Sequence, residues 1–276
     1  MYKHILIALD LEGVNNVVGE PYSGLSKSTE QYEIACKQAV LEVNAAADAL
    51  FQAGAESVTL WDNHGGGDNI SPEWIDPRMK RLDPDYSKYR QYFCEGAGFE
   101  CICYFGYHAM EGTLNGVLAH TMSSKVMQDW KYDGVRIGEV DIDSWIAASH
   151  GIPSVFFASD AQGCRQAKRS IPDIVTVTTK TGTSRNSAIF RDNDELLAEI
   201  REKIVEAVST EHPLRRLPLP STMEKSWKRM EDAAAALKRV RGRGVEADHP
   251  DDEILGKDAH TVVMQIRSVE DFLKSI

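Results

Sequence analysis

Short apolar runs rich in β-branched residues alternate along this chain with longer segments of helical periodicity. Runs of strand length without polar alternation are typical of strands buried on both faces, as in a parallel sheet covered by helices. They lie at His4–Leu9 and at residues 57–61, 100–105, 153–157 and 174–179. This arrangement predicts an α/β fold with a mainly parallel sheet flanked by helices.

The segments between these runs predict the helices. Residues 28–53 carry apolar side chains at helical spacing, and Gly54 follows as a common stop signal. Further helices are predicted at Glu139–Ser149 and at residues 162–168 and 193–208. The chain therefore has helices of sufficient length to connect successive parallel strands.

A proline-rich segment divides the predicted chain into two parts. Residues 212–220 contain three prolines and predict a linker between a metal-binding catalytic α/β domain, residues 1–211, and a smaller C-terminal α+β domain, residues 221–276. In this smaller domain the pattern predicts a helix at 233–240, an exposed basic turn at 238–243, a strand at Thr261–Ile266 and a helix at 269–274.

The charge of the chain limits its partners. A formal net charge of −11 argues against nucleic acid and anionic membranes, because neither polyanion is attracted to a surface of its own sign. No stretch approaches the roughly 18 apolar residues of a membrane-spanning helix. The apolar run after His4 is too short for a signal peptide, so we expect a cytoplasmic protein with no nucleic-acid or membrane partner.

The cysteines limit the kinds of metal site. There are five, and no two of them form a CxxC pair. This pattern disfavours a disulfide framework and a zinc site made of thiolates. A metal bound by this chain would need histidine and carboxylate ligands.

Two acidic residues follow the first predicted strand. The two-residue period of a strand places Asp10 and Glu12 on the same face, where their charges repel each other. A divalent metal at the carboxyl edge of the sheet would compensate them. The alternative is that both acids cap helices or face water.

Two histidines follow later strands in the same way. His64 comes after the second strand and His108 after the third, so both are expected at the carboxyl edge beside the acids. Asp62 would hold the His64 imidazole from behind. The glycines at 65–67 could instead indicate a phosphate loop, but neither GxGxxG nor GxxxxGK[ST] is present. A single histidine at such a position could also be structural.

His120 and Glu139 complete the set of candidates. His120 ends a short apolar stretch, and Glu139 stands at the predicted start of a helix. Alone, His120 could be a core histidine and Glu139 an acid favoured by the helix dipole. Together, three carboxylates and two or three histidines favour zinc or manganese in a hydrolytic site.

Five short blocks in this order resemble the D-aminopeptidase family of dinuclear zinc metallopeptidases. They are D-x-E-G, D-x-H-G, G-Y-H-A, G-V-x-x-H-T-M and G-E, between Asp10 and Glu139. The resemblance implies two zinc ions per subunit, with Asp10 bridging them. The implied ligands are Asp10, Glu12, His64, His108 and Glu139. It also implies that His120 is the catalytic residue, as nucleophile or general base, and that the subunits form a ring-shaped homo-oligomer.

The expected function is an aminopeptidase that releases N-terminal D-amino acids from short peptides. Zinc would polarise the scissile carbonyl and activate water, while Arg185 and Asp160 are candidates for substrate binding. Residues 76–92 depart from the family pattern.

Three alternatives compete with this function. A zinc amidase acting on a non-peptide amide or lactam remains open. So does a noncatalytic assembly protein stabilised by metal, although more than four ligands favour catalysis. A nucleotide-binding enzyme is disfavoured because acids follow the first strand, where phosphate would bind.

Overall fold

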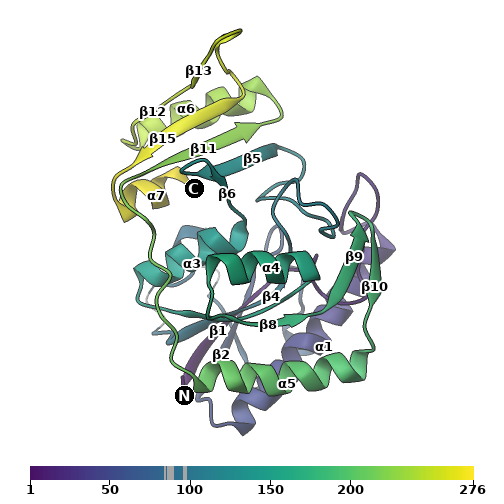
Figure 1. Ribbon diagram of the computed structural model, residues 1–276. Helices are drawn as coiled ribbons and strands as arrows, with labels where there is room; N and C mark the ends of the chain where they lie inside the picture. Colours follow the sequence, from purple (N-terminus) through teal and green to yellow (C-terminus); the bar gives the residue numbers. More distant parts are fainter. Residues whose placement is uncertain (84, 86–89, 96–97) are drawn as a thin grey trace.

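The computed structural model describes residues 1–83, 85, 90–95 and 98–276. Its centre is a six-stranded sheet in the order β3-β2-β1-β4-β7-β8 (Figure 1), in which every neighbouring pair is parallel. The strands are β1 His4–Leu9, β2 Ser57–Asp62, β3 Lys80–Arg81, β4 Cys101–Tyr107, β7 Ser154–Ser159 and β8 Val175–Thr178. The predicted fold class is confirmed, and the predicted strands occur with small shifts at their ends.

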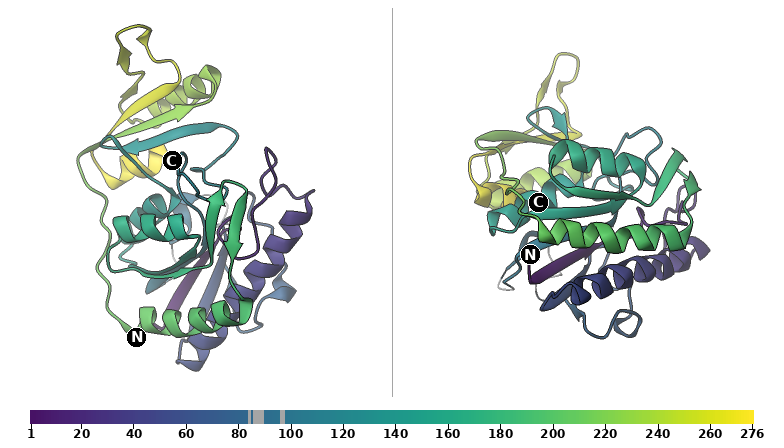
Figure 2. Two further views of the ribbon diagram at one scale, coloured as in Figure 1. Left: turned by 45° about the vertical axis from the view of Figure 1, so that its right-hand side comes forward. Right: turned by 60° about the horizontal axis from the view of Figure 1, so that its bottom comes forward.

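Helices cover both faces of this sheet (Figure 2). They are α1 Glu30–Gln52 and α5 Asn193–Ser209 on one face, and α3 Glu139–Ser149 and α4 Ala161–Ser170 on the other. Strand β1 serves both cores: Ile5 and Ile7 pack in the core with α1 and α5, whereas Leu6 and Ala8 pack in the core with α3. Burial on both faces explains why the strand reads as an unbroken apolar run.

A second sheet of five antiparallel strands lies beyond α3 (Figure 1). Its strands, in spatial order, are β12 Ala247–Asp248, β15 Thr261–Ile266, β11 Ser221–Trp227, β5 Met127–Tyr132 and β6 Val135–Arg136. Two of them come from the middle of the chain and three from the C-terminal part. Trp145 of α3 joins the two layers, because its ring contacts Tyr132 at 4.8 Å and Phe272 at 5.7 Å between centroids. The predicted division into domains at 212–220 stays a prediction.

The helices of the C-terminal part are α6 Met230–Gly242 and α7 Val269–Ser275. The predicted basic turn at 238–243 is wrong, since helix α6 continues to Gly242. The buried face formed by Ala236, Leu237 and Val240 extends through this segment, while Arg239 and Arg241 remain exposed at the helix end, where cations are favourable.

The remaining elements are short. They are the hairpin β9 Lys180–Ser184 and β10 Ser187–Phe190, the hairpin β13 Asp251–Asp252 and β14 Gly256–Lys257, and the 3-10 helices η1 Pro72–Trp74 and η2 Arg90–Tyr92. Among the described residues, no helix combines the length and apolar character needed to cross a membrane.

Candidate metal centre

The polar residues predicted at strand ends meet at one edge of the parallel sheet. Asp10 follows β1, His64 follows β2, and His108 follows β4. Because β1 lies between β2 and β4, these three side chains become neighbours although they are far apart in the chain. This is the carboxyl edge, where the binding sites of open parallel sheets form.

Asp10 and Glu12 are both buried and both face His64. The His64 Nδ1 atom lies 2.9 Å from Asp10 Oδ1 and 3.1 Å from Glu12 Oε2. Gly106 permits this arrangement: it has φ +67°, and a Cβ atom there would lie 1.9 Å from the Asp10 carbonyl oxygen. The sequence expectation that the two acids lie side by side therefore agrees with the structure.

Asp62 orders the loop that carries His64 through hydrogen bonds. The Asp62 carboxylate accepts hydrogen bonds from the backbone amides of Asn69 and Ile70 and from the Asn69 side chain, at 2.7 to 3.0 Å. Asn69 in turn donates to the His64 carbonyl oxygen at 2.6 Å. Asp62 thus orders the backbone around His64, in place of the imidazole contact that the sequence suggested.

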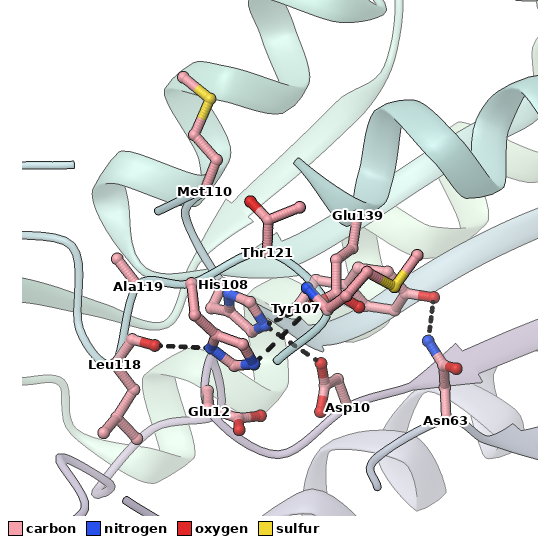
Figure 3. Close-up of polar contacts among 12 residues, drawn as sticks. Asp10, Glu12, Asn63, Tyr107, His108, Met110, Leu118, Ala119, Thr121 and Glu139 are labelled. Carbon is pink, nitrogen blue, oxygen red and sulfur yellow. Dashed lines mark hydrogen bonds and ion pairs between the residues drawn. The ribbon is translucent and has the colours of Figure 1, made fainter. Parts of the chain in front are cut away.

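His108 and His120 are oriented by backbone carbonyls. His108 Nδ1 bonds to the Ala109 oxygen at 3.0 Å, and His120 Nδ1 bonds to the Leu118 oxygen at 2.9 Å. A carbonyl can only accept a hydrogen bond, so each Nδ1 carries a proton. The Nε2 atom on the other side of each ring faces the carboxylates. His108 Nε2 lies 3.3 Å from Glu139 Oε1 and 3.6 Å from Asp10 Oδ2 (Figure 3).

Glu139 begins helix α3 and reaches the same centre. Its Oε1 atom accepts a hydrogen bond from the Met122 amide at 2.8 Å and lies 3.9 Å from His120 Nε2. Its Oε2 atom accepts from Arg90 Nη2 at 2.6 Å. The helix dipole favours an acid at this position, but the contacts with His108 and Arg90 make Glu139 part of the centre.

Arg90 is a residue of this centre that the sequence did not predict. Its guanidinium also pairs with Asp143 at 3.1 Å and donates to Asn63 Oδ1 at 3.1 Å. Arg90 belongs to the segment 76–92 that departs from the family pattern; residues 84 and 86–89 of that segment lie outside the described part. Nothing in its sequence context, apart from the charge of the segment, indicates a position beside Glu139.

The two predicted substrate-binding residues lie in different places. Arg185 lines the cavity and donates to the Ala119 carbonyl oxygen, next to His120. Asp160 is buried and is not among the described residues that line the cavity. It caps α4 by accepting from the Gly163 amide at 2.7 Å, and its other oxygen accepts from the Val117 amide at 2.6 Å. Its position supports the loop that leads to His120.

Comparison with known proteins identifies the family. A sequence model of the peptidase family M55, described as D-aminopeptidase, matches residues 3–253. The chain belongs to the D-aminopeptidase family. The D-aminopeptidase of Bacillus subtilis strain 168 is 23% identical over 183 residues, which span 66% of this chain and 65% of that protein.

The fold agrees with this membership of the D-aminopeptidase family. A solved structure, the Zn-dependent D-aminopeptidase DppA from Bacillus subtilis, a self-compartmentalizing protease, has a TM-score of 0.82. The match covers 98% of this chain and 94% of that one at 20% identity. The resemblance stated from the five sequence blocks is thus confirmed at the level of family and fold.

The carboxylates of this D-aminopeptidase-family chain strongly perturb the imidazoles beside them. Burial by itself lowers the pKa of His64 and His108, but the neighbouring carboxylates outweigh it and raise these pKa values to about 12 and about 10. Burial, together with the charge of Glu12, raises the pKa of Asp10 to about 7. The clustered carboxylates therefore stabilise positive charge beside them, and protonated histidines supply that charge when no other cation is bound.

His120 is perturbed in the opposite direction. Burial, and then the charge of His108, lower its pKa to about 4. This imidazole is therefore neutral at pH 7, with an unprotonated Nε2 atom. Such a group can accept a proton.

A cavity of about 570 Å³ opens above these residues. Asp10, Glu12, His64, His120 and Glu139 line its base. The remaining walls come from residues 23–26, 65–67 and 122–125, from Trp61 and Asp62 at the end of β2, and from Asn63, Arg90, Leu118 and Arg185. Its volume suits a small ligand such as a short peptide.

Two overlapping groups of side chains could hold metal ions. Ligand atoms of Asp10, Glu12 and His108 lie within 4.8 Å of one another, and so do those of His108, His120 and Glu139. Oxygen and imidazole donors without thiolates suit zinc in a catalytic site. His64 joins the first group through its contacts with Asp10 and Glu12.

Proposed function

We propose that this protein is a zinc-dependent aminopeptidase that releases N-terminal D-amino acids from short peptides. Asp10, Glu12, His64, His108 and Glu139 would hold two zinc ions. The observation that carries the proposal is the convergence of three buried carboxylates and two imidazoles at one sheet edge, in a chain of the D-aminopeptidase family.

The donor atoms fit zinc. His108 Nε2 is buried and, among the described residues, has no well-oriented hydrogen-bond partner, although it faces two carboxylates. A metal ion that displaced its proton would provide the missing partner. The Ala109 carbonyl bound to Nδ1 is the kind of outer contact that orients histidine ligands.

Asp10 is the ligand proposed to contact both ions. Its two carboxylate oxygens face different groups: Oδ1 faces His64, and Oδ2 faces His108. Glu12 stands on the His64 side and Glu139 on the His108 side. The residues thus form two sets of donors that share one carboxylate.

The proposed mechanism assigns distinct tasks to metal and protein. When bound, zinc supplies Lewis acidity toward the scissile carbonyl and makes water more acidic. His120 Nε2 would accept the proton that the attacking water loses, because the Leu118 carbonyl keeps the other ring proton on Nδ1. Arg90 holds Glu139 Oε2, so that Oε1 stays directed at the two histidines.

The cavity walls suggest how a peptide is held. Arg185 has one guanidinium nitrogen bound to the Ala119 carbonyl, and its other nitrogens carry further donors. We propose that they bind the carboxylate of a short peptide, for which the planar guanidinium is well suited. We further propose a ring-shaped homo-oligomer, since the structural relative DppA is described as self-compartmentalizing.

Hydrolysis of matched D- and L-alanyl-p-nitroanilide, D-alanyl dipeptides and acylated amines by the purified protein tests this function. We expect D-aminoacyl substrates to be cleaved, activity to disappear on chelation, and zinc to restore it. Cleavage of the acylated amine alone would instead favour a non-peptide amidase. Tightly bound zinc without any hydrolysis would favour a noncatalytic metal-stabilised protein.

A further inference from the structure

Lys180 is a buried charge next to the metal centre, and the proposed mechanism gives it no task. It begins β9, with Thr179 between it and the end of β8, and its side chain is wholly inaccessible. Its Nζ atom donates to the carbonyl oxygens of Glu12, Val14 and Val17, each at 2.6 Å. Three carbonyl acceptors require three N–H donors, which only the ammonium form of lysine offers.

The three carbonyls belong to the irregular segment that carries Glu12. Residues 11–17 form turns with no helix or strand hydrogen bonds to hold their shape. The neighbouring Thr179 hydroxyl donates to the Gly13 carbonyl at 2.5 Å, and the Gly13 amide donates to the Gly106 carbonyl at 2.6 Å. The junction between β8 and β9 therefore supplies most of the partners for the carbonyl groups of this segment, whose amides at Gly13 and Asn15 are bound by Gly106 and Glu42.

We propose that Lys180 is a positioning residue for the metal centre: its ammonium group fixes the backbone of residues 12–17 and thereby the Glu12 carboxylate. This inference rests on the proposed zinc site. Two effects of Lys180 on zinc oppose each other. Its charge repels a cation, whereas its three hydrogen bonds hold a ligand in place. We expect the positioning effect to exceed the repulsion, because one of the three hydrogen bonds holds the backbone carbonyl of the ligand Glu12 itself.

The test compares two buried lysines by substitution with methionine. Lys225 is the matched control: it is also buried, donates to the Ser275 carbonyl at 2.6 Å and lies 3.6 Å from the Trp130 ring centroid, in the second sheet. Zinc affinity is measured by competition with a chelator, and thermal unfolding is followed in parallel. We expect Lys180→Met to bind zinc roughly 10- to 100-fold more weakly than wild type. We expect Lys225→Met to lose thermal stability at unchanged zinc affinity.

Lys180→Gln provides a second variant, because its amide retains two of the three donors without the charge. We expect its zinc affinity to lie between those of wild type and Lys180→Met. Hydrogen exchange supplies a readout without metal: backbone amides of residues 10–18 should exchange faster in both Lys180 variants and at wild-type rates in Lys225→Met.

Zinc affinity equal to or tighter than that of wild type in the Lys180 variants would overturn the positioning role. Where Lys180→Met does not fold, Lys180→Gln decides. If wild type itself binds no zinc, the proposed function fails. Unchanged exchange of residues 10–18 in the Lys180 variants then separately overturns the role of Lys180.

Discussion

The imidazole rings of His108 and His120 stack face to face, with centroids 3.8 Å apart and planes inclined by 13°. Two stacked imidazoles cannot both carry a positive charge at low cost. The structure distinguishes them through their neighbours: His108 faces Asp10 and Glu139, whereas His120 lies nearer the cavity. The ring beside the carboxylates takes the charge, and the other stays neutral.

This stacking predicts how His120 titrates. Burial and the charge of His108 lower the pKa of His120 to about 4 from the ordinary 6.5. The ring is therefore neutral above about pH 4, also in the range up to pH 6.5 in which an ordinary imidazole is protonated. NMR titration of the zinc-free protein should show its midpoint near pH 4. His108→Ala should move this midpoint upward. A midpoint above pH 6 in the wild type would contradict the account.

His120→Ala should remove activity without removing metal. Loss of a group that accepts protons typically lowers kcat by about 10²- to 10⁴-fold, and His120 is not among the proposed ligands. Activity and zinc content are measured together. His150→Ala, at an exposed position beyond α3, is the control and should match wild type. Loss of zinc from His120→Ala would instead show that His120 is a ligand, as its proximity to His108 and Glu139 allows.

Arg90→Ala should strongly destabilise the zinc-free protein. It removes the guanidinium that pairs with the buried carboxylates of Glu139 and Asp143, and loss of one partner from a buried ion pair typically costs about 3–5 kcal/mol. Arg78→Ala is the control from the same segment, since the Arg78 guanidinium is half-exposed and solvent screens its pairs with Asp76 and Asp48, so a clearly smaller loss is expected. Urea unfolding measures both variants. Equal losses would show that Arg90 does not hold the centre together.

Asp160→Ala tests whether Asp160 only caps helix α4 or also positions the loop that leads to His120. Asp160 and Asp192 both cap helices, α4 and α5, so alanine at either position should cost about 0.5–2 kcal/mol. Asp160 also holds the Val117 amide, and the backbone from Val117 leads to His120. We therefore expect kcat to fall in Asp160→Ala and to stay unchanged in Asp192→Ala. Equal kcat values would limit Asp160 to a capping role.

The parallel sheet and its acidic edge could be predicted because both depend on local sequence. The run Ile5 to Leu9 is apolar since both of its faces are covered, and this pattern is visible without any knowledge of tertiary structure. The strand order then brings together Asp10, His64 and His108. Sequence could place each of these residues at a strand end, but it could not supply that order.

The parts that were missed depend on long-range contacts. Arg90 reaches Glu139 from a segment without clear periodicity. Strand β5, which pairs locally with β6, also pairs with the C-terminal β11 across a large separation in sequence. Lys180 shows no sign in its own sequence that it binds the loop after β1. In each case the partner is set by the fold, so local patterns carry no signal for it.

Metal analysis of purified wild type and Asp10→Ala tests the central claim most directly. Asp10 faces both His64 and His108, and so its removal should disrupt both proposed ion positions. We predict two zinc ions per chain in the wild type and a loss of both in Asp10→Ala at preserved secondary structure. A wild type without tightly bound zinc, or an Asp10→Ala variant that retains two ions, would contradict the account.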